Sequence, residues 1–309
     1  MIVYRELSSL QVDLGISLKT LYTLSNEIRR HYRPVSIPKD NGEVRHLTVP
    51  DRELKSVQKR IAEVILPIMP ISPYAMAYRV GGSPLQNASC HVGKPRLLKL
   101  DIRHFFDNII YSTIREYAFP EKQFSEEIRT LLSLLCSYKD TLPQGAPTSP
   151  AISNIIMKGF DDYLGNWCGE RNITYTRYCD DMTFSGDFDP EEVIEVVRHE
   201  LKKLGLYLND KKTIKVHDGQ RKIVTGIVVN EKVSISSSTR KKIRQNLHYC
   251  MNYGIESHMK HADIKISKKL YLQKLLGQVN YVLSVTPNNN EFLTYKNWLT
   301  YNIKLLPSE

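Results

Sequence analysis

Residues 173–185, ITYTRYCDDMTFS, decide the fold of this chain. Two runs rich in β-branched and aromatic residues flank a Cys-Asp-Asp turn, which predicts a β-hairpin with Asp180 and Asp181 at its tip. Some 79 residues earlier, Asp101 closes a short buried-strand candidate, RLLKLDI at 96–102. If strand pairing brings the three carboxylates together, their mutual repulsion favours a bound cation.

An all-oxygen group of this kind suits Mg²⁺ that is held partly by substrate phosphates. Two such ions about 3.5–4 Å apart activate an attacking hydroxyl and stabilise the leaving pyrophosphate, as a polymerase requires. The alternative is that an Asp-Asp pair only favours the turn in which it lies. The three carboxylates by themselves leave both interpretations open.

Hydrophobic periodicity outlines the rest of the chain. It predicts helices at 16–32, 53–66, 190–204, 239–253 and 268–284, and strands at 44–49, 222–229 and 232–235. A further helix is expected where Ser149 is placed to cap and Pro150 to occupy the first turn. The chain should therefore consist of a mixed α and β body followed by a basic helical end.

The net charge of +10 over 309 residues is unevenly distributed. Residues 1–210 hold 26 Lys plus Arg and 27 Asp plus Glu, whereas residues 211–309 hold 17 and 6. A basic segment on a neutral body is typical of nucleic-acid binding and less often of binding to a membrane surface. A solvated lysine-rich face is the alternative that carries no function.

Composition and cysteine spacing exclude several classes of protein. At 41% hydrophobic and 25% charged residues, the chain is neither disordered nor fibrous. The five cysteines form no CxxC pair and have no zinc-ligand spacing. No run approaches the ~20 apolar residues of a membrane span, and the first residues lack the apolar core of a signal peptide. We expect a soluble, cytoplasmic protein with no membrane partner.

Three stretches in order resemble successive motifs of the reverse transcriptase palm: LLKLDIRHFFDNII at 97–110, LPQGAPTSP at 142–150 and YCDD at 178–181. The resemblance implies an α+β right-hand polymerase fold, with an antiparallel sheet packed on helices and a small helical thumb. The implied domains are N-terminal helices and fingers at 1–96, a palm at 97–230 and a thumb at 231–309. It also implies two Mg²⁺ ions per active site, bound by Asp101, Asp180, Asp181 and the backbone of Ile102, with the three aspartates catalytic.

The same resemblance assigns a site for the incoming deoxynucleoside triphosphate. PKDNGEVRHLTVP at 38–50 looks like the fingers segment whose Lys39 and Arg45 reach the triphosphate, although both also fit simple surface charge. The implied contacts elsewhere are Phe106 as the steric gate against ribose, Gln144 in the PQG loop, and Lys212 in LNDKKT as a general acid. Phe105 and Phe106 could instead both be core residues, and Lys211 competes with Lys212.

Two short signatures resemble those of bacterial retron reverse transcriptases. Asn87, Ala88 and His91 in QNASCHVG fit NAxxH, and Val224, Thr225 and Gly226 in KIVTGIVVN fit VTG. The YCDD motif departs from the commoner YADD of that group through Cys179, and we expect activity to survive.

Retron membership implies an RNA-directed DNA polymerase that copies part of a cognate structured noncoding RNA into branched multicopy single-stranded DNA (msDNA). Synthesis would start from the 2′-hydroxyl of an internal guanosine, and the implied role is antiphage defence with an effector protein. The alternatives are an intron-type or CRISPR-associated reverse transcriptase, or a non-catalytic palm that serves as an RNA-binding scaffold.

RNA contacts are expected mainly from the basic helical end, which should grip a duplex through its backbone. The candidate residues are Asn87, His91, Val224, Thr225, Gly226, Arg240, Lys241, Lys242, Arg244, Lys268 and Lys269. Tyr249, Tyr253 and Tyr271 lie among them and suit stacking on unpaired bases, although their helical spacing fits core positions equally well.

Overall fold

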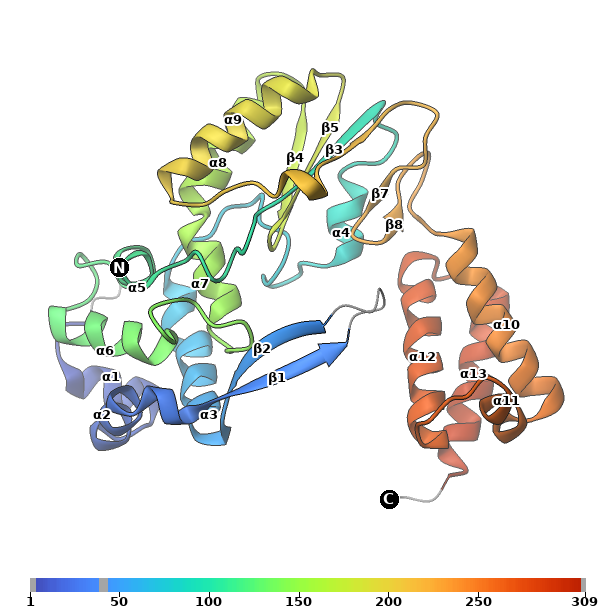
Figure 1. Cartoon of the computed structure of the whole chain (residues 1–309), viewed down its shortest axis with the longest axis horizontal. Helices are drawn as coiled ribbons and strands as arrows, with labels where there is room; N and C mark the ends of the chain where they lie inside the picture. The colour runs from blue at the N-terminus through green and yellow to red at the C-terminus, as the bar shows by residue number, and fades with distance from the viewer. Residues whose placement is uncertain (1–3, 39–43, 307–309) are drawn as a thin grey trace. The chain divides into compact units, whose positions relative to one another are not determined.

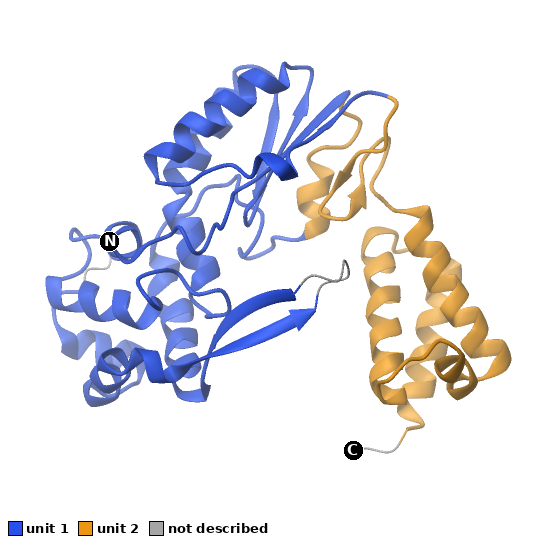
Figure 2. Cartoon of the chain, viewed as in Figure 1, with its two compact units in different colours: residues 1–83, 95–218 blue, residues 84–94, 219–309 orange. Residues whose placement is uncertain are grey.

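The computed structural model describes residues 4–38 and 44–306 (Figure 1). The chain forms two compact units, each assembled from segments that are distant in sequence (Figure 2). Unit 1 comprises residues 1–83 and 95–218, and unit 2 comprises residues 84–94 and 219–309. The expected functional division into fingers, palm and thumb, with boundaries at 97 and 231, stays a prediction.

Unit 1 contains a four-stranded antiparallel sheet with the strand order β4-β5-β3-β6. Its strands are β3 (Arg96–Asp101), β4 (Thr174–Tyr178), β5 (Asp181–Gly186) and β6 (Ile214–Val216). The strand predicted to end at Asp101 and the hairpin predicted at 173–185 are both confirmed. The hairpin pairs Tyr178 with Asp181, so only Cys179 and Asp180 form its loop.

The register of β3 against β5 separates an apolar face from a polar one. Leu98 lies opposite Phe184 and Leu100 lies opposite Met182, and all four side chains are buried. Because successive side chains of a strand point to opposite faces, Asp101 and Asp181 share the other face. The hydrophobic core of unit 1 thus fixes which way the acidic residues point.

Helices α7 (Ser149–Ile156) and α8 (Lys158–Gly169) lie between β3 and β4 in the chain, and α9 (Pro190–Lys203) lies between β5 and β6. The ends of α9 show why it forms where predicted. Asp189 caps its N-terminus by accepting a hydrogen bond from the Glu191 N–H, and Pro190 fills the first position. Val197 and Leu201 lie on its buried face.

The start of α7 corrects the sequence prediction by one residue. Thr148 occupies the N-cap position, and Ser149 is the first helical residue. The Ser149 hydroxyl donates to the carbonyl of Pro143 at 2.7 Å instead of capping the helix. Ser149 therefore ties the helix to the preceding PQG loop.

The other regular elements of unit 1 are mainly helices and one long hairpin. The helices are α1 (Leu7–Leu14), α2 (Leu18–Asn26), α3 (Arg52–Arg60), α5 (Tyr111–Thr113) and α6 (Glu126–Cys136), and the hairpin pairs β1 (Tyr32–Pro38) with β2 (Val44–Pro50). The predicted helix at 16–32 ends at Asn26 and is followed by a 3₁₀ turn at Ile28–His31. The helix predicted at 53–66 continues past Arg60 as a π-helical turn to Ile65.

Unit 2 joins a small sheet to a helical end. Its short helix α4 (Pro84–Ser89) packs on β7 (Ile223–Val224) and β8 (Ile227–Val228), which pair in a three-stranded sheet with β9 (Ser234–Ile235). Four helices follow: α10 (Ser237–Tyr253), α11 (Ile255–His261), α12 (Lys268–Val285) and α13 (Asn290–Lys304). The predicted helices at 239–253 and 268–284 are confirmed, whereas α11 and α13 were not predicted. The expected α+β class, with antiparallel sheets packed on helices, is also confirmed.

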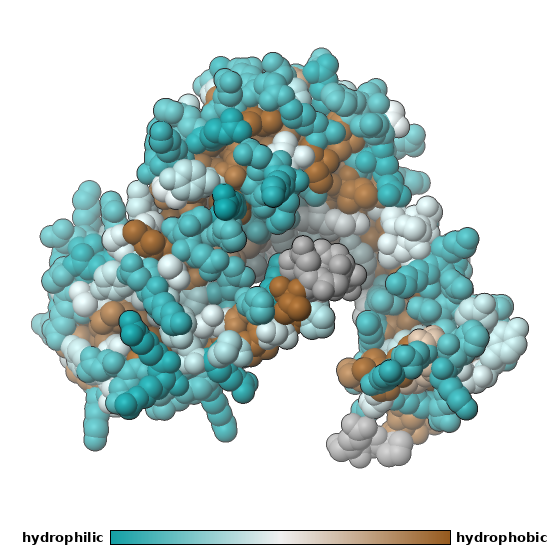
Figure 3. All heavy atoms as spheres, viewed as in Figure 1, coloured by the Kyte–Doolittle hydropathy of each residue, from teal (hydrophilic) through white to brown (hydrophobic). Residues whose placement is uncertain are grey.

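No helix among residues 4–38 and 44–306 is long and apolar enough to cross a membrane. On the face seen in Figure 3, hydrophilic residues cover most of the surface and hydrophobic ones form only small groups.

The two short signatures meet inside unit 2. Thr225 and Gly226 form the β7–β8 turn at φ 46° and 82°, a conformation that is unfavourable for a β-branched residue. The Thr225 hydroxyl compensates by donating to the carbonyl of Pro84, at the start of α4, at 2.8 Å. His91, just beyond α4, is fully buried.

Burial of His91 makes a pH-dependent contribution to stability. Desolvation, helped by the charge of Lys94, lowers the pKa of His91 from 6.5 to about 4. Between these values the unfolded chain binds a proton that the folded chain does not, so stability is complete above pH 6.5 and falls as the pH drops towards 4. The loss expected over this window is about 3 kcal/mol.

We therefore expect His91→Leu to flatten the pH dependence of unfolding between pH 6.5 and 4, as measured by urea titration at each pH. His199→Leu, at an exposed position of α9, is the matched control and should keep the wild-type slope. Equal slopes in the wild type and His91→Leu would contradict the expectation.

Candidate active site

A cavity of about 960 Å³ in unit 1 gathers most of the residues predicted to act on the nucleotide. Side chains from β2, the end of β3, the β4–β5 turn, the PQG loop and the 3₁₀ turn at Asp210–Lys212 line it. The predicted site residues among them are Arg45, Asp101, Ile102, Phe106, Gln144, Asp180, Asp181 and Lys212. Lys39 lies outside the described residues.

The three carboxylates come together through strand pairing. Asp101 and Asp181 are directly opposite in the β3–β5 ladder, which places their Cβ atoms about 4.5–5.5 Å apart on one face. Asp180 occupies the hairpin loop, and its carbonyl accepts a hydrogen bond from the Ile102 N–H at 3.1 Å. This bond ties the tip of the hairpin to the end of β3.

Asp101 is buried and held on both oxygens. Its Oδ2 accepts from the Lys212 ammonium at 2.7 Å and its Oδ1 accepts from the Asn209 amide at 3.0 Å. The hydrogen bond between Lys212 and Asp101 is the main reason why the pKa of Lys212 is raised above its usual value. Of the two candidate lysines, Lys212 is thus the one in contact with the Asp101 carboxylate, while Lys211 also lines the cavity.

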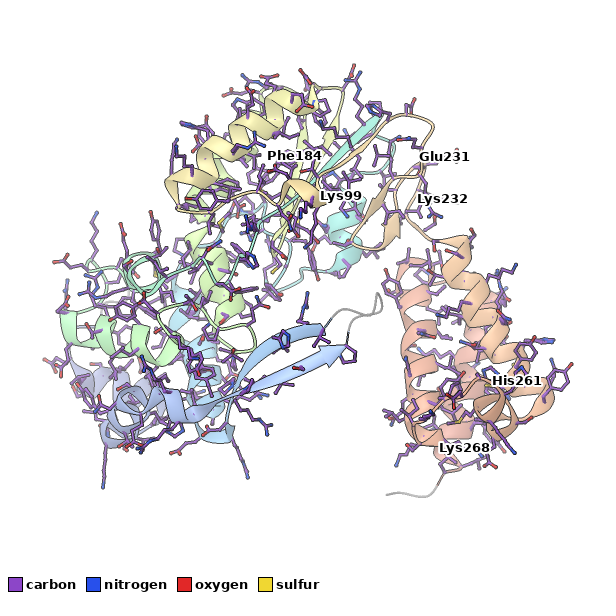
Figure 4. All side chains as sticks on the ribbon, in the orientation of Figure 1. Lys99, Phe184, Glu231, Lys232, His261 and Lys268 are labelled. Atoms are coloured by element: carbon purple, nitrogen blue, oxygen red, sulfur yellow. The ribbon has the colours of Figure 1, made fainter. Side chains whose placement is uncertain are left out.

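At Asp181, by contrast, the surroundings disfavour the charged form of the carboxyl group. Desolvation raises its pKa first, and the negative charges of Asp180 and Asp101 raise it further. Lys99, two residues before Asp101 on β3 (Figure 4), and Lys212 only partly offset this effect. The cluster therefore sets three carboxylates against two lysines, Lys99 and Lys212.

This donor set fits a hard divalent cation. Within residues 4–38 and 44–306, no group of three or more His, Cys, Asp or Glu side chains is already arranged as a metal site. The carboxylates nevertheless repel one another, and an ammonium group sits on Asp101 where a metal would bind. Oxygen ligands with unneutralised charge are what Mg²⁺ and similar ions prefer.

The nucleotide-contact candidates are arranged along the walls of the cavity. Arg45 is exposed on β2 and Gln144 is partly exposed in the PQG loop. Phe105 is buried in the core and Phe106 is partly exposed, and both line the cavity. The two rings differ in exposure only, and the role of Phe106 as a steric gate stays a prediction.

Gly145 allows the PQG loop to dock on β2. The Thr48 N–H donates to the carbonyl of Gln144 at 2.8 Å, and a Cβ on Gly145 would lie only 2.9 Å from the Thr48 carbonyl oxygen. Gly145 also has φ 126°, which side chains rarely tolerate. Glycine is needed here because the two backbones come so close.

Sequence reasoning missed several residues of the site. Tyr78, Arg103, His104 and Asn209 also line the cavity. Asn209 lies within the LNDKKT stretch, so its motif offered a signal. Tyr78 offered none, because its hydroxyl reaches the Cys179 thiol from a segment about 100 residues away in sequence.

The predicted RNA contacts all lie in unit 2 and differ in accessibility. The side chains of Asn87, His91 and Val224 are buried, so their expected contact with RNA, which stays a prediction, would require the backbone or a rearrangement. Lys241 and Lys242 are exposed on α10. Arg244 is paired with Glu291 at 2.7 Å and Lys268 with Glu256 at 3.0 Å.

Residues 37–244 match the family described as reverse transcriptase (RNA-dependent DNA polymerase). The chain belongs to this family. It is therefore an RNA-directed DNA polymerase, and divalent metal chemistry is general for such enzymes.

Two relatives support the same family assignment. The retron Mx65 reverse transcriptase of Myxococcus xanthus is 30% identical over 84% of this chain and 67% of its own length. The retron Ec86 reverse transcriptase of Escherichia coli is 29% identical over 95% of this chain and 89% of its own length. The resemblance to retron reverse transcriptases is thus confirmed. Among solved structures, an apo telomerase from Candida tropicalis has a TM-score of 0.49 at 12% identity, over 88% of this chain and 58% of the telomerase chain.

The repulsion at Asp181 predicts a stabilising substitution. In EDTA, Asp181→Asn should raise the melting temperature, on the order of 2 °C, because it removes one of three clustered negative charges. Excess Mg²⁺ should then stabilise the wild type more than the variant, because the wild type keeps the third carboxylate as a ligand.

Glu195→Gln removes an exposed carboxylate of α9 and is the matched control. It should leave the melting temperature unchanged both in EDTA and in excess Mg²⁺. A melting temperature of Asp181→Asn at or below the wild-type value in EDTA would contradict the electrostatic account.

Proposed function

We propose that this chain is a retron-type reverse transcriptase that copies part of a cognate structured noncoding RNA into branched multicopy single-stranded DNA. The observation that carries the proposal is the placement of Asp101 opposite Asp181, with Asp180 beside them, in a cavity that also holds Arg45, Gln144 and Lys212. The retron relatives and the NAxxH and VTG signatures support the retron type.

In this proposal, Asp101, Asp180, Asp181 and the carbonyl of Ile102 hold two Mg²⁺ ions. When bound, the ions supply an activated hydroxyl and charge stabilisation at the phosphoryl group. Arg45 offers a planar guanidinium that matches phosphate oxygens, and Lys212 would protonate the leaving pyrophosphate. Release of Lys212 from Asp101 would accompany metal binding, since both need the same carboxylate oxygen.

Unit 2 is the proposed RNA-binding part. It carries 15 Lys plus Arg against 5 Asp plus Glu, a net charge of +10, which leaves unit 1 neutral with 28 of each. Such a charge attracts phosphate backbones with an affinity that falls as salt rises. Lys241 and Lys242 are the exposed candidates, whereas Arg244 and Lys268 would first have to leave their carboxylate partners.

The remaining partners follow from the retron type. They are the cognate RNA with its DNA product, deoxynucleoside triphosphates and a retron effector protein, in the cytoplasm of a bacterium. Priming would use the 2′-hydroxyl of an internal guanosine, and the biological role would be antiphage defence.

The decisive experiment is to purify the protein from its native host and sequence the attached nucleic acid. We expect an RNA joined to single-stranded DNA through a 2′–5′ branch. The Asp180→Asn, Asp181→Asn variant should retain the RNA but lack the DNA, because its carboxylate site no longer supports phosphoryl transfer.

Each other outcome excludes a part of the proposal. Unbranched complementary DNA would indicate an intron-type or CRISPR-associated enzyme. RNA without DNA in both the wild type and the variant would indicate a non-catalytic scaffold.

The cavity position of Phe106 predicts its effect on sugar discrimination. Phe106→Ala should admit ribonucleotides, because the ring that would exclude a 2′-hydroxyl is lost, and incorporation should be compared in a primer-extension assay with either nucleotide. Phe106→Tyr keeps the ring and should keep discrimination. Unchanged discrimination in Phe106→Ala would exclude Phe106 as the gate.

A further inference from the structure

The catalytic hairpin turns through an unfavourable backbone conformation. Cys179, between Tyr178 and Asp180, has φ 62°, in the left-handed region that side chains other than those of glycine, asparagine and aspartate rarely adopt. A residue other than glycine that is held in this region is strained and persists only where its surroundings enforce it. The peptide unit that enters Asp180 therefore needs an external support.

Arg177 supplies a contact of this kind from beneath the turn. Its side chain is fully buried, and its Nη1 donates to the carbonyl of Cys179 at 2.8 Å. That carbonyl belongs to the peptide that joins Cys179 to Asp180. Because peptide units are planar, fixing the carbonyl also fixes the N–H at which Asp180 begins.

Arg177 is itself held rigidly. Its Nε and Nη2 donate to the two oxygens of Asp161, on α8, at 2.8 and 2.6 Å. Neither side chain is exposed, and the Tyr175 hydroxyl also donates to Asp161 at 2.8 Å. A bidentate pair of this type fixes both the direction and the plane of the guanidinium.

The same guanidinium is linked through Asn154 to a segment that lines the cavity. Nη2 also donates to Asn154 of α7 at 3.2 Å, and the Asn154 amide donates to the carbonyl of Ala77 at 2.8 Å. Ala77 precedes Tyr78, which lines the cavity next to Cys179. One buried group thus connects α7, α8, the catalytic turn and the segment that carries Tyr78.

We propose that Arg177, oriented by Asp161, is a positioning residue that sets the location of the Asp180 carboxylate for catalysis. The inference rests on the proposed role of Asp180 as a metal ligand. Arg177 lies on the same sheet face as Met182, opposite which it pairs, and so acts from the core side while the carboxylates point to the other side.

Stability alone does not explain a charged pair at this place. A buried ion pair usually gains little over well-packed apolar residues, because removing both charges from water costs about as much as their attraction returns. A guanidinium has five donors in a fixed plane, which lysine lacks. Here those donors bind Asp161 twice, Asn154 once and the Cys179 carbonyl once.

This difference between stability and positioning provides the test. The triple variant Arg177→Met, Asp161→Leu, Tyr175→Phe replaces the pair by apolar groups and removes the hydroxyl that would otherwise be left without an acceptor. It should still fold, with a melting temperature a few degrees below that of the wild type, because the Cys179 carbonyl and the Asn154 amide oxygen lose a donor. On a homopolymeric RNA template with a DNA primer, we expect kcat to fall about 10²-fold, as for a misplaced catalytic group.

Two further readouts separate positioning from structural support. The KM for the nucleotide should stay within about twofold, because the printed hydrogen bonds of Arg177 go to Asp161, Asn154 and Cys179 and not to the proposed nucleotide contacts. The Mg²⁺ concentration for half-maximal activity should rise, because Asp180 is displaced. Arg129→Met is the matched control. Arg129 is another buried arginine, and it donates to the backbone carbonyls of Phe119 and Arg115, which do not belong to the hairpin turn. The Arg129→Met variant should therefore lose stability and keep the wild-type kcat.

A triple variant that folds and retains wild-type kcat and Mg²⁺ requirement would overturn the proposal. If the triple variant does not fold, Arg177→Lys is measured well below its own melting temperature. A lower kcat with an unchanged nucleotide KM then supports the proposal, and a wild-type kcat overturns it. Failure of the wild type itself to synthesise DNA in this assay would count against the polymerase function and not against the positioning role.

Discussion

The register between β3 and β5 is the constraint on which the active site depends. Leu98 and Leu100 pair with Phe184 and Met182 on the core face, so Asp101 must face Asp181 on the other. A slip of one residue would turn either the apolar set towards the cavity or the carboxylates into the core. Burial of four large apolar side chains therefore opposes the one-residue slips that would separate the acids. Hydrophobic packing in this way maintains a charge cluster that is unfavourable in itself.

Much of this arrangement could be predicted from local sequence. The strand that ends at Asp101 and the hairpin around Cys179 follow from patterns within a few residues, and both form where expected. The division between Phe105 and Phe106 could not be predicted, because it depends on which side of the chain faces the sheet. The docking of Gly145 on β2 likewise depends on two segments about 100 residues apart.

Arg177 shows most clearly why sequence patterns are insufficient. In the sequence, an arginine within a polar and aromatic strand suggests an exposed position, since arginine is rarely buried without a partner. Its partner Asp161 lies 16 residues earlier, on a helix whose own periodicity marks no special role. Only the packing of α8 on β4 brings the two charges together. Similarly, the NAxxH and VTG stretches are short polar signatures in the sequence, yet they pack on each other within unit 2.

The distribution of charge follows from the needs of the two units. An active site that must bind cations through carboxylates cannot also carry a large excess of lysine, because ammonium groups compete for the same oxygens, as Lys212 does at Asp101. The Cys179 thiol does not change this charge balance. Burial raises its pKa to about 12, so it adds no charge beside Asp180 at neutral pH. A polymerase must nevertheless attract a polyanion. Placing the whole net charge of +10 in unit 2, while unit 1 stays neutral, meets both requirements, since phosphates are attracted without an excess of ammonium groups in the unit that holds Asp101, Asp180 and Asp181.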